Sequence, residues 1–229
     1  MIRFFYNMAP NPMKVALMLE ETGLDYEPVP IDTRRGEQHT AEFRALNPNS
    51  KLPVITDGEA VIFDSNAILL HLAEKTGTFM PVEPTGRASL LSWLMFAASG
   101  VGPFSGQAVH FRNFAPEKLP YAIKRYDFEA RRHWQIVDDR LSIGRYMLGD
   151  TYTIVDMAVW GWGSRLTYML GDDDIMRKYP NLDRLMREID ARPAAARAQA
   201  LKQRHAFKAE MDETAMRSLY PQIFAPQPA

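Results

Sequence analysis

Short apolar segments alternate with helical patterns along the first third of the chain. Residues 2–6 are apolar and aromatic and predict a buried strand. A helix is expected next, because Asn11-Pro12 is typical of a helix start, with the asparagine as the cap, and Gly23 is typical of a helix end. Residues 25–32 alternate apolar and polar positions but contain two prolines, which favours an edge strand. This order of strand, helix and strand is the unit of a parallel pair.

A β-hairpin is predicted after a charged loop and a short helical pattern at residues 41–46. Two apolar runs flank Asp57-Gly58, a dipeptide that favours a tight hairpin turn. The first run starts at Leu52-Pro53, where a proline fits because it has no N–H to donate to a ladder. The second run ends at Asp64-Ser65, directly before a helical pattern over residues 65–75. The resulting element order is β-α-β-α-β-β-α, which predicts a thioredoxin-like α/β domain with helices on both faces of a mixed sheet.

Strand patterns stop after about residue 80. Residues 79–86 are rich in proline and glycine and predict a linker. Helical patterns then follow one another, including an amphipathic stretch over 121–141 and a capping box over 153–156. We therefore expect a domain over residues 1–80, a linker over 81–86 and an all-helical domain over 87–229, which is the class α/β + all-α. The chain from residue 205 onwards contains prolines at 221, 226 and 228 and is expected to be an extended surface tail.

The composition is that of a soluble globular protein. Of the 229 residues, 46% are hydrophobic and 24% are charged, and a net charge of −1 provides no overall field that would attract nucleic acid or an anionic membrane. We expect neither a signal peptide nor an apolar run long enough to span a membrane, and therefore a cytoplasmic protein. With no cysteine, the chain has no disulfide, no thiolate metal site and no thiol nucleophile of its own. Any sulfur chemistry must therefore use a sulfur atom that a ligand brings.

The hairpin places two features of a peptide-binding site close together. The backbone edge at Leu52-Pro53 can pair with an extended ligand. The helix start at Asp64-Ser65 has free N–H groups that can hold a carboxylate. From these residues alone, the hairpin predicts a site for the carboxylate and backbone of a small peptide.

An ordered series of motifs resembles the cytosolic glutathione transferases. The general marks are Lys51-Leu52-Pro53, Asp64-Ser65 and the capping box over 153–156. A second series resembles the bacterial nu class, whose members are glutathione-dependent disulfide-bond reductases related to the yeast nitrogen-regulator prion protein: Trp93, Gly100-Val101-Gly102-Pro103, Gly106-Gln107, His110-Phe111, Ala115-Pro116 and Pro120-Tyr121-Ala122-Ile123. The resemblance covers roughly residues 1–205. It implies a thioredoxin-like domain followed by an all-helical domain, glutathione as co-substrate, and no metal.

The resemblance also implies a position for each part of glutathione. The Leu52–Pro53 peptide is expected to be cis, with the backbone of Leu52 pairing with the cysteinyl backbone of glutathione. Asp64 is expected to face the γ-glutamyl ammonium, and Ser65 to hold the γ-glutamyl carboxylate. Gln38 and Lys51 match positions that reach the glycyl end. Plainer interpretations are a strand-start proline, a simple helix cap, and two solvated side chains in a charged loop.

Two residues compete as the group that activates the thiol of glutathione. Asn11 matches an asparagine that the nu class has just after its first strand, and we expect its amide to lie near the sulfur; its alternative role is a helix cap alone. Tyr6 is the second candidate, because other classes use a tyrosine near the end of this strand. The nu class also has a threonine here, and Ala9 stands in its place, so one expected hydroxyl is missing.

The resemblance implies a homodimer and leaves three functions open. Arg132 matches an arginine that, in the nu class, reaches the glutathione site from the partner subunit; its alternative is a solvated helix face. The favoured function is a glutathione-dependent thiol–disulfide oxidoreductase that uses the thiolates of bound glutathione to reduce small disulfides. The alternatives are a transferase that conjugates glutathione to electrophiles, and a non-enzymatic glutathione-binding regulatory protein.

Overall fold

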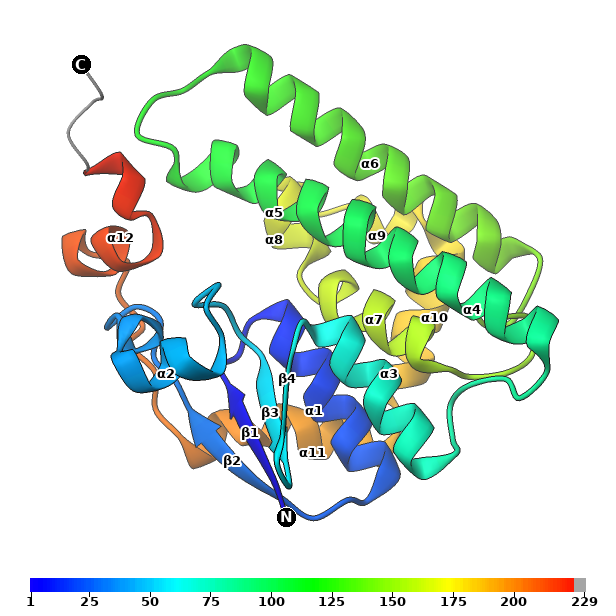
Figure 1. Ribbon diagram of the computed structural model, residues 1–229. Coiled ribbons are helices and arrows are strands. Elements are labelled where there is room, and N and C mark those ends of the chain that lie inside the picture. Colours follow the sequence, from blue (N-terminus) through cyan, green and yellow to red (C-terminus); the bar gives the residue numbers. More distant parts are fainter. Residues whose placement is uncertain (225–229) are drawn as a thin grey trace.

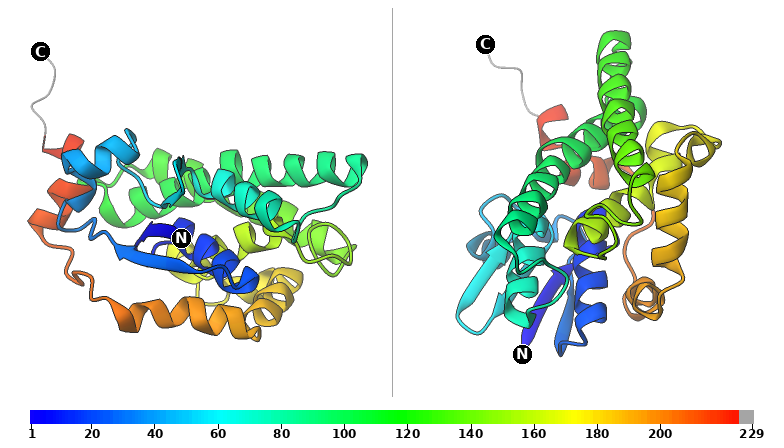
Figure 2. Two further views of the ribbon diagram at one scale, coloured as in Figure 1. Left: turned by 60° about the horizontal axis from the view of Figure 1, so that its bottom comes forward. Right: turned by 90° about the vertical axis from the view of Figure 1, so that its right-hand side faces the viewer.

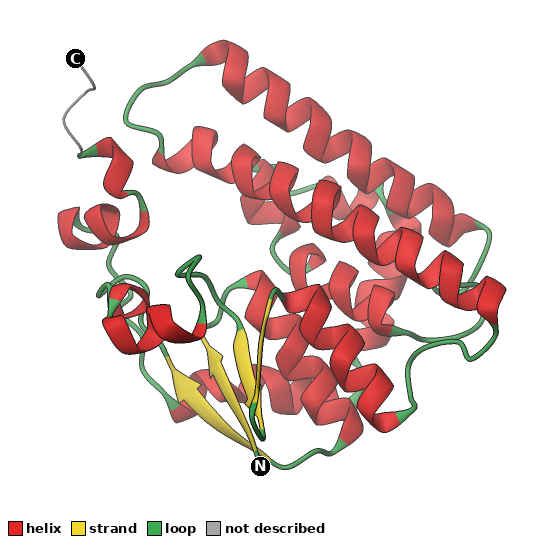
Figure 3. Cartoon of the chain, viewed as in Figure 1, coloured by secondary structure: helices red, strands yellow, loops and turns green. Residues whose placement is uncertain are grey.

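The computed structural model describes residues 1–224, and in it a small sheet is joined to a bundle of helices (Figures 1 and 3). The sheet has the strand order β2-β1-β3-β4. Strand β1 pairs in parallel with β2 and antiparallel with β3, and β3 pairs antiparallel with β4. The strand bounds are Ile2–Tyr6, Tyr26–Pro30, Val54–Asp57 and Ala60–Phe63 for β1 to β4. The sheet is therefore mixed, as the element order predicted.

Helices cover both faces of this sheet because the side chains of β1 alternate between two apolar clusters. Phe4 and Tyr6 belong to a cluster with α1 and α3. Phe5 points to the other face, where its ring lies 6.2 Å from that of Phe43 in α2. The bounds are Pro10–Thr22 for α1, Ala41–Leu46 for α2 and Ser65–Thr76 for α3, with a short 3-10 turn η1 at Glu37–His39. This is the predicted thioredoxin-like arrangement.

The rest of the described chain contains helices and no strand. Helix α7 lies at its centre and packs against α1, so it joins the helical part to the sheet. It begins with the predicted capping box: the Thr153 hydroxyl and the Asp156 carboxylate satisfy N–H groups of the first turn. The helices are α4 (Pro84–Phe96), α5 (Gly102–Val109), α6 (Pro120–Ser142), α7 (Ile154–Gly163), α8 (Leu166–Leu170), α9 (Ile175–Lys178), α10 (Pro180–Asp190), α11 (Pro193–Arg204) and α12 (Glu213–Leu219).

One helical stretch differs from the expectation about apolar runs. Two π-helical segments, η2 (Ala97–Val101) and η3 (His110–Phe114), extend α4 and α5 into one helix over Pro84–Phe114. By length and composition alone this helix could cross a membrane, so the expectation that no such run exists was wrong. Leu90 and Leu94 on it are fully buried in the core, and α4 and α5 pack against α7 and α6, so part of its apolar surface serves the packing of the bundle.

The C-terminal segment also differs from its prediction. Instead of an extended tail, residues 206–224, here called the C-terminal arm, include α12 and a 3-10 turn η4 (Pro221–Ile223). Figures 1 and 2 show the arm turning back from α11 to lie beside α2 and the end of the α4–α5 helix. Asp212 caps α12 by accepting a hydrogen bond from the N–H of Ala215, a signal that the proline-rich context masked. The predicted tail residues Pro226 and Pro228 lie outside the described residues.

Candidate functional site

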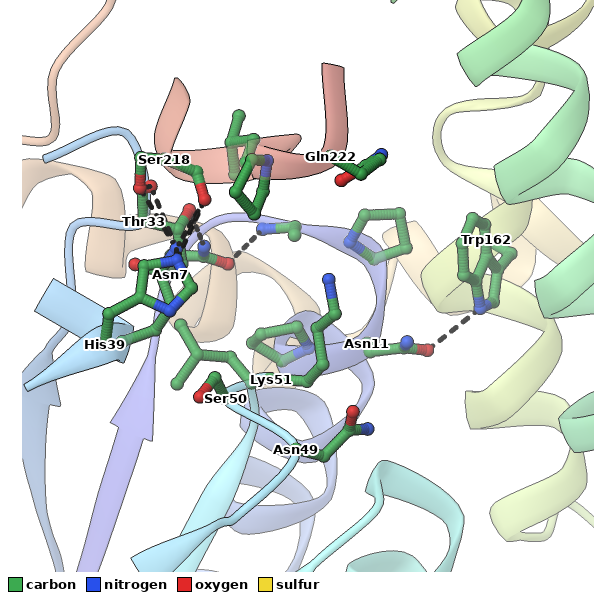
Figure 4. A pocket seen from close by; sticks show the side chains of 17 residues that line it. Asn7, Asn11, Thr33, His39, Asn49, Ser50, Lys51, Trp162, Ser218 and Gln222 are labelled. Carbon is green, nitrogen blue, oxygen red and sulfur yellow. Dashed lines mark hydrogen bonds between the residues drawn. The ribbon is translucent and has the colours of Figure 1, made fainter. Parts of the chain in front are cut away.

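A cavity of about 360 Å³ lies beyond the carboxyl end of β1, where the sheet meets the helical bundle and the arm (Figure 4). A cavity of this size falls in the range of small-molecule sites. It is lined by the start of α1, the loop before β3, the loop around η1, Trp162 of α7 and the arm. The lining residues are Asn7, Ala9, Pro10, Asn11, Pro12, Thr33, Gln38, His39, Asn49, Ser50, Lys51, Leu52, Trp162, Ser218, Leu219, Pro221 and Gln222.

Asn11 lies in the first turn of α1 and points toward Trp162. Helix α1 begins at Pro10 with Ala9 as its N-cap and no side-chain cap, so the interpretation of Asn11 as the cap was wrong. The indole Nε1 of Trp162 donates a hydrogen bond to Oδ1 of Asn11 at 2.9 Å (Figure 4). Since an indole N–H can only donate, this bond orients the amide, and no residue of 1–224 accepts a hydrogen bond from Asn11 Nδ2. The amide nitrogen is therefore a free donor at the cavity wall.

The backbone at Leu52 forms an unpaired edge on the cavity. The Leu52–Pro53 peptide is cis, as expected. Pairing of β3 with both of its neighbours begins at Val54, so Leu52 lies beyond the ladder. The preceding loop is held by Asn47, whose Nδ2 donates to the carbonyl oxygen of Lys51 at 2.8 Å. An extended peptide can therefore pair with Leu52 without displacing a strand.

Asp64 and Ser65 lie next to this edge rather than in the cavity lining. Phe63 pairs with Val54, which brings the residues after β4 beside Leu52–Pro53. The backbone of Asp64 has φ +68°, and its Oδ1 accepts hydrogen bonds from the N–H groups of Asn66 at 2.9 Å and Ala67 at 3.2 Å. The first turn of α3 thus faces the unpaired backbone, as the hairpin pattern predicted.

Gln38 is buried on the cavity wall and is held by the arm. Its Nε2 donates to Oγ of Ser218 at 3.1 Å and to the carbonyl oxygen of Thr33 at 3.3 Å. Its Oε1 is buried and has no hydrogen-bond partner among residues 1–224. This oxygen has almost no accessible surface, so it faces the protein and not the open cavity. Lys51, the other residue expected near the glycyl end, is exposed on the cavity rim.

Two predicted site residues, Tyr6 and Arg132, lie outside the cavity. Tyr6 is fully buried, and its hydroxyl contacts Nδ1 of His205 at 2.8 Å, so it does not line the cavity and is not available to a ligand there. Alternation along β1 turns its ring into the core, where burial raises the pKa of the hydroxyl. Arg132 lies on the outer surface of α6, where its Nε donates to Glu129 at 2.9 Å. Within one chain it is not part of the cavity lining.

Sequence reasoning missed the residues that other parts of the chain bring to the cavity. Asn7 follows β1, and its Nδ2 donates to Oγ1 of Thr33 at 3.1 Å. It could have been noticed as a polar residue after a buried strand. Trp162 and Ser218 come from α7 and the arm, far along the chain, and no local pattern marks them as site residues.

Both parts of the chain match known families. Residues 3–74 match "Glutathione S-transferase, N-terminal domain", and residues 121–188 match "Glutathione S-transferase, C-terminal domain". The chain is 38% identical over 205 residues to "Disulfide-bond oxidoreductase YfcG" of Escherichia coli, with 86% of this chain and 94% of that protein covered.

Solved structures of bacterial proteins resemble the whole fold. A glutathione transferase family member from Pseudomonas fluorescens "with two glutathione bound" has a TM-score of 0.82 and 34% identity, covering 86% of this chain and 91% of that one. A glutathione transferase from Pseudomonas putida "with one glutathione disulfide bound per one protein subunit" has a TM-score of 0.81 and 31% identity, covering 86% and 90%.

Proposed function

Because the chain belongs to the glutathione transferase family, we propose that it is a glutathione-dependent thiol–disulfide oxidoreductase that reduces small disulfides. The observation that carries the proposal is the amide of Asn11, which Trp162 holds with its nitrogen free at the wall of the cavity. The chain has no cysteine, so the reacting thiolates come from glutathione itself. The disulfide-bond oxidoreductase YfcG and the relatives that hold two glutathiones or glutathione disulfide support this chemistry.

The free-energy requirement for thiolate formation is small enough for one donor. A free thiol has a pKa of about 8.5, so a thiolate majority at pH 7 needs a shift of about 1.5 units, or about 2 kcal/mol. A hydrogen bond to a charged acceptor contributes about 1.5–3 kcal/mol. Asn11 Nδ2 can supply this bond, and the first turn of α1 adds partial positive charge. Ala9 offers no hydroxyl, so Asn11 is the side chain on which we base thiol activation.

The reaction proceeds as two thiol–disulfide exchanges. The thiolate of one glutathione attacks a sulfur of the small disulfide, forming a mixed disulfide and releasing one thiolate, which takes up a proton. A second glutathione thiolate then attacks the glutathione sulfur of the mixed disulfide, giving glutathione disulfide and the second thiol. Two glutathiones are oxidised by two electrons in total, and one disulfide is reduced to two thiols.

The peptide frame of glutathione is proposed to lie along the hairpin. Leu52, next to cis-Pro53, would pair with the cysteinyl backbone, and Asp64 and Ser65 would hold the γ-glutamyl end. Gln38 on the cavity wall and Lys51 on the rim would approach the glycyl end.

We also propose a homodimer in which Arg132 of the partner subunit reaches the site. On α6 it lies beside Phe128, a large apolar side chain that is 60% exposed in the single chain. The test is complementation between two inactive variants, Asn11→Ala and Arg132→Ala, combined as a mixed dimer. If the arginine acts across the interface, one of the two sites regains both residues and about half of the activity returns. If it acts within its own chain, the mixed dimer stays inactive.

The proposed activity is tested by offering the protein two kinds of co-substrate. Glutathione and 2-hydroxyethyl disulfide, coupled to glutathione reductase and NADPH, report disulfide reduction. Glutathione and 1-chloro-2,4-dinitrobenzene report conjugation. We expect fast reduction and slow conjugation. Fast conjugation with negligible reduction would instead identify a conventional transferase, and binding without turnover of either would identify a glutathione-binding protein.

A further inference from the structure

Lys14 of α1 is a buried cation that no role described so far explains. Its side chain is 1% exposed. Nζ donates to Oδ1 of Asn66 at 3.1 Å, the single hydrogen bond that it makes within residues 1–224. An ammonium has three donors, and burying one with so few partners is costly. Gly161 of α7 closes the space beside it, because a Cβ added there would lie 3.1 Å from Cβ of Lys14.

The partner of Lys14 belongs to the turn that starts α3. Asn66 is buried, and its backbone N–H donates to Oδ1 of Asp64 at 2.9 Å. Asp64 has a positive φ of 68°, a conformation that non-glycine residues rarely adopt and that neighbouring contacts must hold. Ser65 lies between these two residues. Lys14 is thus joined through one side chain to the turn that faces the unpaired backbone of Leu52.

The charges around Lys14 are few. Burial lowers its pKa to about 7, while the negative charge of Asp64 acts in the opposite direction. The groups that face it from α3 and α7, Asn66 and Gly161, carry no charge. A charge that approaches Lys14 near neutral pH therefore changes its protonation.

We propose that Lys14 is a positioning residue for the γ-glutamyl end of glutathione, whose carboxylate its ammonium attracts from behind the Asp64–Ser65 turn. This inference rests on the proposed function, in which that end binds at the turn. The γ-glutamyl end carries one ammonium and one carboxylate. The negative charge of Asp64 complements the ammonium, and the positive charge of Lys14 complements the carboxylate. Without Lys14, the carboxylate would approach a turn whose one charged group is itself negative.

This arrangement couples the binding of glutathione to the protonation of Lys14. The arriving carboxylate favours the charged form of Lys14 and raises its pKa, so at about pH 7.5 Lys14 should take up a fraction of a proton on binding, which offsets part of the proton that the glutathione thiol releases. A lysine that only fills space would produce neither proton uptake nor a preference for the carboxylate.

The test compares two ligands and three variants. The ligands are glutathione and 4-aminobutyryl-cysteinyl-glycine, which is glutathione without the γ-glutamyl carboxylate. Lys14→Met removes the charge and the donor, whereas Lys14→Gln removes the charge but keeps a donor for Asn66. Lys75→Met is the control, because it removes an equal charge from the far end of α3. KM and kcat are measured for both ligands, and proton uptake by calorimetry in buffers of different ionisation enthalpy.

We expect Lys14→Met and Lys14→Gln to raise the KM for glutathione by about tenfold, the size of one weak charge-assisted interaction, with kcat changed less than about twofold. The KM for the shortened ligand should change little, and glutathione binding to the variants should release more protons than binding to the unaltered protein, by the fraction that Lys14 takes up. Equal losses for both ligands, or discrimination retained in Lys14→Gln, would show a structural role and overturn the inference. If Lys14→Met does not fold, Lys14→Gln alone decides. Failure of the unaltered protein to bind glutathione would instead contradict the proposed function.

Discussion

The indole Nε1 of Trp162 donates to Oδ1 of Asn11 at 2.9 Å, which fixes the orientation of an amide at the cavity wall. The two residues come from the helical bundle and from the first helix after β1, so the contact joins the two parts of the fold at the proposed reaction site. The contact determines which atom of the Asn11 amide can face a ligand. The oxygen of Asn11 is occupied, and only the nitrogen remains to donate to a sulfur.

Replacing Asn11 tests this direction. Asn11→Ala removes the donor and should raise the pKa of the bound glutathione thiol by about 1–2 units. Because less of the thiol is then ionised at neutral pH, kcat/KM for disulfide reduction should fall by about 10- to 100-fold. Asn11→Asp should be more harmful than alanine, because a carboxylate near the sulfur repels a thiolate. The thiol pKa is measured from the ultraviolet absorbance of the thiolate against pH. Equal activity in Asn11→Ala would remove Asn11 from the mechanism.

Replacing Trp162 tests the orienting contact itself. Trp162→Phe keeps an aromatic ring but leaves Oδ1 of Asn11 free to compete for the position facing the sulfur. We expect kcat/KM to fall by about two- to twelvefold, the range of a neutral hydrogen bond of about 0.5–1.5 kcal/mol. Trp93→Phe is the control, because Trp93 lies on α4 and is not part of the cavity lining. A loss of the same size in both variants would indicate a general effect on packing.

Removing the end of the arm should open the cavity without unfolding the protein. In a chain stopped after residue 210, Gln38 and His39 lose their contacts with Ser218. We expect the KM for glutathione to rise several-fold and the melting temperature to change little, because Ala215 is the one fully buried apolar side chain of α12. Ser218→Ala should show a smaller change in the same direction. A truncated chain with an unchanged KM would mean that the arm is not a working wall of the site.

Lys14 predicts a pH-dependent difference in stability. Its pKa is lowered on folding from 10.5 to about 7, so the folded state disfavours the charged form. The contribution of Lys14 to the unfolding free energy therefore increases as the pH rises from about 7 toward 10.5, and below about pH 7 its cost is complete. The melting temperature of Lys14→Met, relative to the unaltered protein, should be highest at acid pH and fall as the pH rises. A difference in melting temperature that stays constant from about pH 7 to pH 10.5 would contradict the lowered pKa of Lys14.

Local patterns were sufficient wherever a few neighbouring residues decide the structure. Asp57-Gly58 marked the hairpin, and Thr153 and Asp156 marked the start of α7. The amphipathic pattern over 121–141 located α6 (Pro120–Ser142) to within a residue at each end. These signals depend on turn geometry, capping and periodicity, all of which operate within one or two turns of chain.

The errors came from orientation and from distant contacts. Tyr6 was the second candidate because of its position, and the alternation of β1, which counted against it, does turn its ring into the core. The helix α12 directly precedes the prolines on which the tail prediction rested, and its contact with Gln38 joins residues 180 positions apart. The bond between Asn11 and Trp162 spans 151 positions. Neither contact could be read from spacing, because each depends on how the bundle and the arm settle on the sheet.

The position of the arm also bears on when the site can form during synthesis. The segments from the end of β1 to the loop before β3 are made early, and most of the cavity wall belongs to them. The wall formed by Ser218, Leu219, Pro221 and Gln222 is translated last among the lining residues. A nascent chain on the ribosome therefore carries an open half-site, and glutathione can meet an enclosed one only after the arm has been made.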